Sequence, residues 1–244
     1  MGIKFEKYYD INYDDVDFNL NATIISLANF ISDISVRQSY TVGDGIDNLI
    51  HKGLGWVFYK YDISIKKYPK FRDKVKVITE CYGFKKFYAF RKYKIQNENN
   101  EVVAEAKAIF LMIDLKKRRL LRIPKQEYEI YGFEKDLDFE LQFEDIKEVE
   151  NEDTIKELNV EYDEIDSNFH ANNVNYLKWA INSLPKEIFE NKCINKISIN
   201  FLKECKHGDL VKVKSKIIDS KESIHKICDI NNKKLAMVDI YYDN

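Results

Sequence analysis

The densest group of polar side chains in the second half of this 244-residue chain lies between Asp166 and Tyr176. Asp166, Asn168 and His170 follow one another at intervals of two residues, so an extended backbone would project all three to one side. A histidine beside carboxylate and amide groups can be held in one tautomer and used as an acid, a base or a hydrogen-bond donor. Asp and Asn are also common helix caps, and a lone histidine is often structural. Spacing alone therefore leaves a catalytic and a structural interpretation open.

An amphipathic helix is predicted directly after this segment, from about residue 172 to 184, where Pro185 ends it. Its first backbone N–H groups, near Asn172 and Asn173, have no partner within the helix and carry partial positive charge. Such groups could stabilise an oxyanion that forms on a carbonyl. The apolar face of the helix is formed by Tyr176, Leu177, Ala180, Ile181 and Leu184.

The first half of the chain is predicted to open with a strand-like stretch, residues 4–18, and then to contain one helix and a run of strands. The helix spans residues 22–36, with Asn21 as a possible cap, and gives way at Gly43-Asp44-Gly45. From Trp56 onward the apolar residues alternate with a period of two, which is typical of strands. One long helix followed by antiparallel strands is an α+β arrangement. The strand-like segments after Trp56 include residues 61–65, 75–77, 84–96, 102–114 and 118–123.

The second half repeats this order and indicates an internal duplication. A short strand over residues 158–162 precedes the second helix, and four alternating strands follow it, at about 195–203, 210–218, 223–230 and 235–242. The two halves also align without a gap at an offset of 136 residues. The matched pairs are Ile63 with Ile199, Ile65 with Phe201, Asp73 with Asp209, Val75 with Val211, and Val77 with Val213.

The formal net charge of −2 conceals two oppositely charged stretches. Residues 60–125 hold 19 Lys or Arg and 7 Asp or Glu, whereas residues 131–166 hold 3 Lys and 15 Asp or Glu. The acidic stretch has little periodicity, so we interpret it as a solvated connector between the halves. The basic segment either keeps the protein in solution or presents a positive face to an acidic partner. It carries no known nucleic-acid-binding motif, and the acidic stretch would oppose such binding.

Composition favours a globular protein in a reducing cytoplasm. Hydrophobic residues make up 45% of the chain, which supports a substantial core, and no apolar run approaches the length of a membrane span. No cofactor is expected, and the possible metal ligands His170, Cys193, Cys205 and His207 match no common zinc spacing. The cysteines are scattered and form no CxxC pair; they are Cys81, Cys193, Cys205 and Cys228.

The segment from Asp166 to Trp179 resembles the signature of the acyl-ACP thioesterases of the plant and bacterial fatty-acid type. The family pattern D-x-N-x-H-x-N-N-x-x-Y-x-x-W is matched at each fixed position. Downstream, Phe201-Leu-Lys-Glu204-Cys205 resembles the family's Y-R-R-E-C, with Phe in place of Tyr and one Arg lost. The resemblance extends over nearly the whole chain from Tyr9. Its other matches are Gly43-Asp44-Gly45, Trp56-Val57, Tyr68-Pro69-x-x-x-Asp73 and the basic stretch from Lys116 to Pro124.

This resemblance implies a tandem hotdog fold, in which two antiparallel sheets each wrap around a helix. Residues 1–130 would form an N-terminal hotdog without a catalytic set, which would bind the acyl chain through the helix at 22–36 and strands near Trp56. Residues 131–156 would form an acidic linker. Residues 157–244 would form the C-terminal hotdog that carries the catalytic residues. The first half has no D-x-N-x-H segment, and the residues at the offset of Glu204 and Cys205 are Tyr68 and Pro69.

The implied activity is hydrolysis of the thioester that joins a fatty acyl chain to acyl carrier protein. Carried over by position, the catalytic set is Asp166, Asn168, His170 and Glu204. Glu204 and His170 would orient and deprotonate a water, Asn168 would fix the water or the carbonyl, and Asp166 would hold the geometry and charge of the network. The amides near Asn172 and Asn173 would receive the oxyanion.

Cys205 offers an alternative nucleophile, because Cys, His and Asn together suggest papain-like chemistry. Neighbours on a strand point to opposite faces, so Cys205 should face away from the site if Glu204 faces it. Other functions remain open, namely an acyl-CoA thioesterase, a hotdog dehydratase or hydratase acting on an acyl thioester, and a non-catalytic acyl-binding module.

The implied partner is acyl carrier protein with its phosphopantetheine-linked acyl chain, and neither nucleic acid nor membrane is expected to bind. Carrier proteins are acidic, so we expect the docking face to lie at the densest basic cluster. A homodimer stays open, since a tandem pair already provides the usual hotdog interface within one chain. The docking cluster comprises Lys116, Lys117, Arg118, Arg119 and Arg122, with Lys125 beside it.

Overall fold

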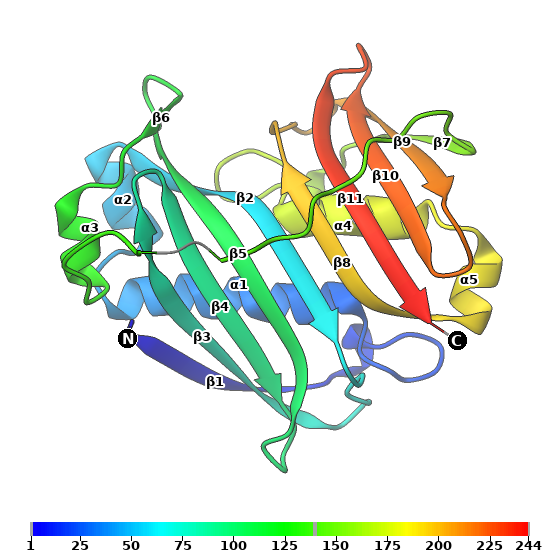
Figure 1. Cartoon of the computed structure of the whole chain (residues 1–244), viewed down its shortest axis with the longest axis horizontal. Helices are drawn as coiled ribbons and strands as arrows, with labels where there is room; N and C mark the ends of the chain where they lie inside the picture. The colour runs from blue at the N-terminus through cyan, green and yellow to red at the C-terminus, as the bar shows by residue number, and fades with distance from the viewer. Residues whose placement is uncertain (1, 139–140, 244) are drawn as a thin grey trace. The chain divides into compact units, whose positions relative to one another are not determined.

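The structure is a computed structural model that describes residues 2–138 and 141–243. The chain divides into two compact units, Met1–Phe143 and Glu144–Asn244. In each unit an antiparallel sheet curves around a helix that lies against one face (Figure 1). The α+β class and the two-fold repeat of sheet and helix that the sequence predicts are therefore confirmed.

Unit 1 is a five-stranded sheet in the order β1-β3-β4-β5-β2, with the short strand β6 paired to the end of β5. Thr23 caps the central helix, α1, by accepting a hydrogen bond from the Ser26 amide, so Asn21 is not the cap. The helix ends at Thr41, just before Gly43, where the sequence predicts that it gives way. The elements are β1 (Lys4–Asp10), a 3-10 turn η1 (Tyr13–Asp15), α1 (Ile24–Thr41), α2 (Ile46–Lys52), β2 (Leu54–Ile65), β3 (Lys74–Lys85), β4 (Tyr88–Gln96), β5 (Val102–Asp114), β6 (Arg119–Leu121) and α3 (Lys125–Ile130).

Unit 2 is a five-stranded sheet in the order β8-β11-β10-β9-β7. Its central helix, α4, is capped by Asn172, whose side chain accepts from the Val174 amide. Pro185 does not simply end a helix: it precedes a second, short helix, α5. The elements are β7 (Thr154–Asn159), a 3-10 turn η2 (Tyr162–Glu164), α4 (Asn173–Asn182), α5 (Lys186–Asn191), β8 (Cys193–Phe201), β9 (Leu210–Ile217), β10 (Glu222–Asp229) and β11 (Lys234–Asp243).

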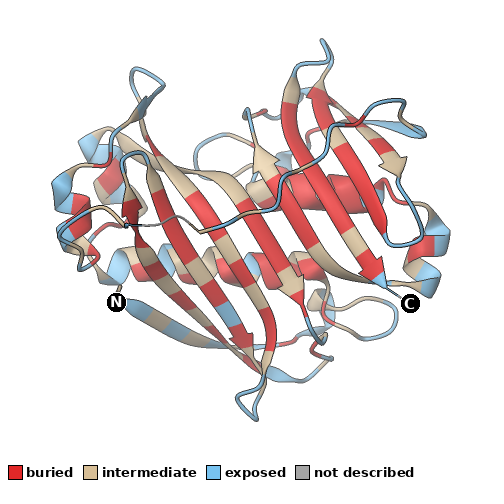
Figure 2. Cartoon of the chain, in the orientation of Figure 1, coloured by how far each residue is buried: buried red, intermediate tan, exposed pale blue. Residues whose placement is uncertain are grey.

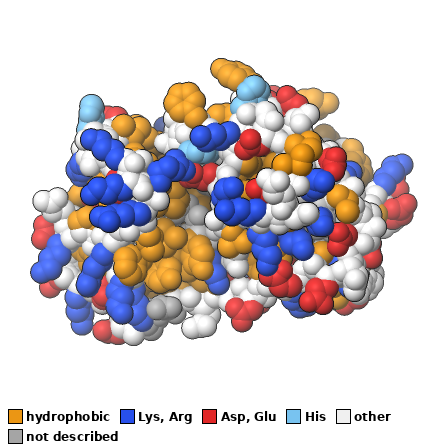
Figure 3. Space-filling view, turned by 90° about the horizontal axis from the view of Figure 1, so that it is seen from above, with side chains coloured by type: hydrophobic (Ala, Val, Ile, Leu, Met, Phe, Trp, Pro, Cys, Tyr) orange, Lys and Arg blue, Asp and Glu red, His pale blue; other side chains and the backbone are white. Residues whose placement is uncertain are grey.

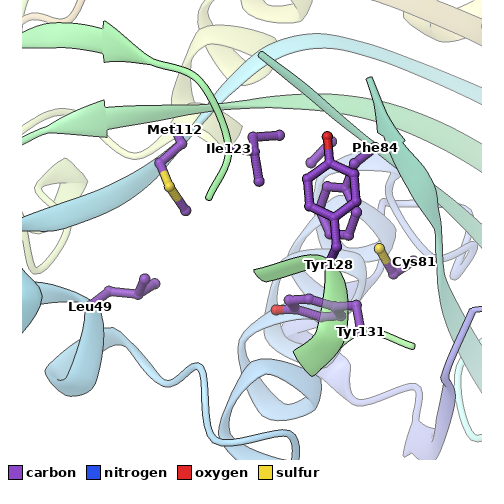
Figure 4. Packing of buried hydrophobic residues seen from close by; sticks show 8 residues of the cluster. Leu49, Cys81, Phe84, Met112, Ile123, Tyr128 and Tyr131 are labelled. Atoms are coloured by element: carbon purple, nitrogen blue, oxygen red, sulfur yellow. The ribbon is translucent and has the colours of Figure 1, made fainter. Parts of the chain in front are cut away.

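Buried residues line the strands of each sheet and the helix that each sheet encloses (Figure 2). In unit 1 the apolar stripe predicted for α1 faces the core: Leu27, Ala28, Ile31 and Ile34 are completely buried. A second apolar cluster of unit 1 joins α2, α3 and the ends of β3 and β5, where the Tyr128 ring packs on Phe84 (Figure 4). This cluster is formed by Leu49, Cys81, Phe84, Ala89, Met112, Ile123, Tyr128 and Tyr131.

The repeat predicted at an offset of 136 residues appears in the hydrogen bonds of the two units. Before β3, the Asp73 carboxylate accepts from the Lys70 amide at 2.8 Å. Before β9, the Asp209 carboxylate accepts from the Lys206 amide, also at 2.8 Å. The first strands pair in the same register, Asp10 opposite Lys74 in unit 1 and Asn159 opposite Leu210 in unit 2.

The acidic stretch is ordered against the units and is not a solvated connector throughout. In unit 1, Tyr131 is buried and the Leu137 side chain lies directly over Gly83. In unit 2, residues 144–153, which we call the strap, cross the face of the sheet opposite α4 (Figure 1). Val149 of the strap is buried against Ile224 and Met237. The boundary between the units falls after residue 143, and β7 starts at Thr154, so the linker expected over 131–156 is divided between the two units.

Within residues 2–138 and 141–243, no helix is both long enough and apolar enough to cross a membrane. All four cysteines are free thiols, of which Cys193 alone is exposed.

Candidate active site

His170 lies in a tight turn that Asp166 closes. One carboxylate oxygen of Asp166 accepts from the backbone amides of Asn168, at 2.8 Å, and His170, at 3.3 Å. The Asp166 amide donates to the His170 carbonyl at 2.8 Å, and Ile165 forms a bridge with Ala171. The segment is therefore not extended, and Asp166 faces the backbone of its own turn. The expectation that Asp166, Asn168 and His170 project together to one side is wrong because this side-chain turn replaces the strand.

The side chain of His170, just before α4, contacts the side chain of Glu204. The Nε2 atom of His170 is 3.3 Å from a carboxylate oxygen of Glu204, and the two side chains are 13% and 37% exposed. Glu204 lies in an irregular segment, residues 202–206, that follows the end of β8. The Ala171 amide donates to the Cys205 carbonyl at 2.8 Å and ties this segment to the histidine turn. The sequence-predicted pair is thus in contact, and it is partly open to solvent.

The tip of the turn points outward. Asn168 is exposed, and Phe169 is 81% exposed with a backbone φ of 62°, a conformation that side-chain-bearing residues seldom adopt. The structure therefore brings His170 and Glu204 together, uses Asp166 to shape the turn, and leaves Asn168 on its exposed side.

Cys205 lies on the opposite side of its segment from Glu204. Its side chain is 2% exposed, and its sulfur is 3.2 Å from the Tyr176 hydroxyl. Burial raises the pKa of the Cys205 thiol to about 11. The expected alternation of Glu204 and Cys205 holds, although the segment is a loop and not a strand.

The amides at the start of α4 are mostly used within the chain. The Asn172 amide donates to the Glu164 carbonyl at 2.8 Å, and the Asn175 amide donates to the Asn172 carbonyl at 2.9 Å. The Asn172 side chain occupies the Val174 amide. The Asn173 N–H makes no backbone hydrogen bond with the part of the chain that the structure describes. Of the two amides predicted for an oxyanion, the Asn173 amide is the one that these bonds leave open.

Glu164 is a buried carboxylate beneath the turn that the sequence did not single out. One of its carboxylate oxygens accepts from the Trp179 indole N–H at 3.0 Å and is 3.4 Å from the Lys178 ammonium. The Asn175 side chain donates to the Glu164 carbonyl at 2.8 Å. Glu164 thereby fixes η2 and the start of the turn to α4. Its place two residues before the end of the acidic stretch, among other carboxylates, gave no sequence signal that it is buried.

Unit 1 contains a second copy of the turn, which the D-x-N-x-H pattern does not reveal. Asp17 accepts from the amides of Asn19, at 2.8 Å, and Asn21, at 3.0 Å, just as Asp166 accepts from Asn168 and His170. The Ala22 amide donates to the Pro69 carbonyl at 2.7 Å, which matches the bond from Ala171 to Cys205. The signal was present as D-x-N-x-N-A against D-x-N-x-H-A at an offset of 149 residues. Asn21 therefore occupies the place of His170.

The predicted basic cluster is exposed at the hairpin between β5 and β6. Asp114 shapes this hairpin by accepting from the amides of Lys116, at 3.0 Å, and Lys117, at 2.8 Å. Basic side chains gather on the left of the space-filling view, the side on which β6 lies in Figure 1 (Figure 3). The exposed residues are Lys116, Lys117, Arg118, Arg119, Arg122 and Lys125.

A different polar cluster lies at the far end of α4, in the core of unit 2. The buried His225 is within 3.0 Å of the hydroxyls of Ser183, Ser215 and Ser223. Burial lowers the pKa of His225 to about 3, so the ring is neutral at physiological pH. Across the described residues, no group of three or more His, Cys, Asp or Glu side chains is placed to hold a metal ion.

Comparison with known proteins covers both units. The acyl-ACP thioesterase N-terminal domain model matches residues 2–131, and the C-terminal domain model matches residues 147–243. An oleoyl-acyl carrier protein thioesterase of Coriandrum sativum is 24% identical, over all of this chain and 71% of that protein. An acyl-[acyl-carrier-protein] hydrolase of Cuphea viscosissima is 26% identical, over 91% of this chain and 57% of its own length. The chain thus spans between just over half and just over two thirds of these curated relatives.

Solved structures share the fold of the whole chain. A 12:0-ACP thioesterase from Umbellularia californica superposes with a TM-score of 0.88 at 17% identity, covering 98% of this chain and 97% of that one. An acyl-ACP thioesterase from Bacteroides thetaiotaomicron superposes with a TM-score of 0.87 at 19% identity, covering 98% of each chain. At these identities the superpositions establish the tandem hotdog fold. The two domain models, which cover nearly all of its residues, place the chain in the acyl-ACP thioesterase family.

Proposed function

We propose that the chain hydrolyses the thioester between a fatty acyl chain and acyl carrier protein, and that unit 2 carries the chemistry. The observation that carries this proposal is the contact between His170 and Glu204 at 3.3 Å, beside the start of α4 and partly open to solvent. A histidine in contact with a carboxylate can act as a general base and hold a water next to a bound carbonyl. The names of the relatives supply the substrate class.

In the proposed reaction, Glu204 and His170 bind a water and remove its proton as the oxygen attacks the thioester carbonyl. The tetrahedral intermediate then collapses, the carbon–sulfur bond breaks, and the carrier's thiolate leaves with the electron pair. Free fatty acid and the carrier with its thiol restored are the products. A thiolate leaves readily, so the protein need not supply a strong acid.

The oxyanion of the intermediate is proposed to be received by the Asn173 amide at the first turn of α4. Support comes from the hydrogen bonds of that turn, which use the amides of Asn172, Val174 and Asn175 and leave the Asn173 amide open. Asn168 is proposed to reach the substrate from the exposed side of the turn, while Asp166 keeps the His170 backbone in place.

Water, and not Cys205, is the proposed nucleophile. Burial raises the pKa of the Cys205 thiol to about 11, so the side chain is almost entirely protonated at pH 7. The sulfur also lies in the buried side of the segment, beside the Tyr176 hydroxyl. Both observations make the thiolate scarce and poorly accessible.

Unit 1 is proposed to bind the acyl chain and the carrier. It has Asn21 and Tyr68 where unit 2 has His170 and Glu204, so it is free of the catalytic requirement. Half-buried apolar side chains around its second cluster, among them Leu54, Trp56 and Phe110, are better placed than the fully packed α1 to meet a lipid. The basic hairpin between β5 and β6 is proposed to receive the acidic carrier. The free thiols support a reducing compartment.

The test is hydrolysis of a panel of acyl carrier proteins of graded chain length by wild type, Glu204→Ala and Cys205→Ala. Release of free thiol by wild type, its loss in Glu204→Ala and its retention in Cys205→Ala are expected. Loss in Cys205→Ala with an acyl-enzyme trapped in wild type would make the cysteine the nucleophile. If folded wild type cleaved acyl-CoA but no acyl carrier protein, the carrier assignment would be wrong. If it cleaved neither, the thioesterase assignment would fail.

A further inference from the structure

The Tyr176 hydroxyl lies beside the backbone on both sides of Glu204. Tyr176 is buried in the first turns of α4, and its hydroxyl donates to the Lys203 carbonyl at 3.3 Å. The same oxygen accepts from the Cys205 amide at 3.2 Å. The two bonds therefore clamp the residue before Glu204 and the residue after it.

The segment that Tyr176 clamps has no regular structure of its own. Residues 202–206 lie beyond the paired part of β8, and the amides of Leu202 and Lys203 both turn to the Leu235 carbonyl, at 2.8 and 3.0 Å. The position of the Glu204 side chain thus depends on anchors outside the segment. The Tyr176 ring is itself fixed, because it packs against Trp179 with ring centroids 5.0 Å apart and against Phe201 at 5.6 Å.

Unit 1 builds the same backbone without this clamp. At the offset of 149 residues the counterpart of Tyr176 is Leu27, which has no hydroxyl and is fully buried. At the offset of 136 residues the counterpart of Cys205 is Pro69, which has no N–H to donate. Unit 1 therefore lacks both the hydroxyl acceptor and the amide donor of this hydrogen bond. The Pro69 carbonyl nevertheless still accepts from the Ala22 amide at 2.7 Å. The fold therefore does not require the clamp. The clamp is present in unit 2, which has Glu204, and absent from unit 1, which has Tyr68 at that position.

We propose that Tyr176 is a positioning residue that holds Glu204 against His170; this inference rests on the proposed hydrolysis. Without the hydroxyl, the Cys205 amide and the Lys203 carbonyl lose a buried partner, and the segment shifts to satisfy them elsewhere. Glu204 moves with it, because it lies between the two. A displacement of about 1 Å in a catalytic group can lower the rate by about 100-fold.

The decisive experiment is a double-mutant cycle on acyl carrier protein substrates with Tyr176→Phe, Glu204→Gln and the double variant. Tyr176→Phe is expected to lower kcat by about tenfold or more and to change KM by less than about twofold. In the Glu204→Gln background the same substitution is expected to lower kcat by less than about twofold, because the carboxylate it positions is already gone. An unchanged kcat in Tyr176→Phe would overturn the proposal. So would a loss that multiplies in full with that of Glu204→Gln.

Hydrogen exchange tests the clamp without using activity. Peptides that span residues 202–206 are expected to exchange faster in Tyr176→Phe, whereas peptides from β10 should not change. Tyr9→Phe is the matched control, because it removes a hydroxyl that bonds Asp33 at 2.6 Å in unit 1. It should leave both kcat and the exchange of 202–206 unchanged. Unaltered exchange of 202–206 in Tyr176→Phe would refute the clamp whatever the reaction is, whereas an inactive wild type would instead refute the proposed function.

Discussion

Asp166 and Asp17 close two copies of the same turn, one beside His170 and one in unit 1. Substituting each of them therefore distinguishes a structural role of the carboxylate from a catalytic one. Each carboxylate accepts two amides of its own turn. We expect Asp166→Ala to lower kcat by about tenfold or more, since the turn that holds His170 loosens, and Asp166→Asn to keep most activity because its amide oxygen still accepts. Steady-state kinetics measure both.

The matched control is Asp17→Ala, which removes the same two bonds in unit 1. It should lower the free energy of unfolding about as much as Asp166→Ala does, while kcat stays at the wild-type value. An Asp166→Asn variant as inactive as Asp166→Ala would show that the charge of Asp166, and not its turn, is what the reaction needs.

Asp239 makes stability depend on pH at neutral values. It is completely buried beneath the strap, and its pKa is raised to about 7. Burial is the main cause; the Lys147 amide opposes the rise by donating a hydrogen bond, and the nearby Glu222 carboxylate adds to it. The folded state binds this proton more tightly than the unfolded state, so the contribution favours folding at pH 4 and is lost as pH rises through 7. We expect the fall in Tm between pH 5 and pH 8 to be smaller in Asp239→Asn than in wild type.

Glu127 has a pKa raised to about 7 by burial and by the neighbouring Asp44, so part of the fall in Tm should persist in Asp239→Asn. Asp14→Asn, at an exposed position, is the control and should reproduce the wild-type curve. Parallel curves for Asp239→Asn and wild type would show that Asp239 does not bind the proton.

The strap is an element without regular structure that is nevertheless fixed by side chains. The Lys147 ammonium is 2.6 Å from the nearly buried Glu222 carboxylate, and further lysines of the sheet pair with Glu144 and Glu152. We expect Lys147→Ala to lower the free energy of unfolding by about 1–2 kcal/mol, because Glu222 keeps its charge beside Asp239 without a cation. Urea unfolding measures this. Lys135→Ala breaks a fully exposed pair with Asp138 and should cost less than about 0.5 kcal/mol.

Elements with a clear apolar period were predictable from the sequence, and those held by side-chain contacts were not. Strand β5 begins and ends where alternation predicts, at Val102 and Asp114, and α1 follows its apolar stripe. The short helices α2, α3 and α5 each span seven residues or fewer, which is too short for a 3.6-residue period to show. The strap was mistaken for a solvated connector because its single buried residue, Val149, is surrounded in sequence by charges whose partners lie on other elements.

For the whole molecule, the uneven charge predicts how the carrier is bound. If the basic hairpin receives an acidic carrier, Arg119→Glu with Arg122→Glu should raise KM for acyl carrier protein about tenfold at low salt and leave kcat unchanged. Hydrolysis of a small acyl thioester of N-acetylcysteamine should not change. Lys135→Glu with Lys186→Glu alters the net charge equally at other exposed sites and should have no effect. An equal rise in KM for both double variants would place docking elsewhere.

The site was predictable as residue types but not as geometry. The sequence identified His170 and Glu204, and the structure places their side chains in contact. Each could be identified because it belongs to a short contiguous motif, His170 to D-x-N-x-H and Glu204 to the segment at the end of a strand. The motif spacing gave Asp166 the wrong orientation, since a side-chain turn and an extended strand share the same spacing of two. It could not show that Tyr176 reaches the Glu204 segment, because that contact joins residues 27 or more positions apart.

The turn in unit 1, which lacks the catalytic His and Glu, also predicts how many acyl-carrier molecules one chain binds. A chain with two copies of the framework, but His and Glu in only one, should bind a single equivalent of a non-hydrolysable acyl-carrier analogue. Calorimetric titration of the chain would then saturate at one mole per mole, where an ancestral pair of identical hotdogs would take up two. Because only one copy of the framework carries His and Glu, substitutions at Asn21 and Tyr68 should not change the number of reacting centres.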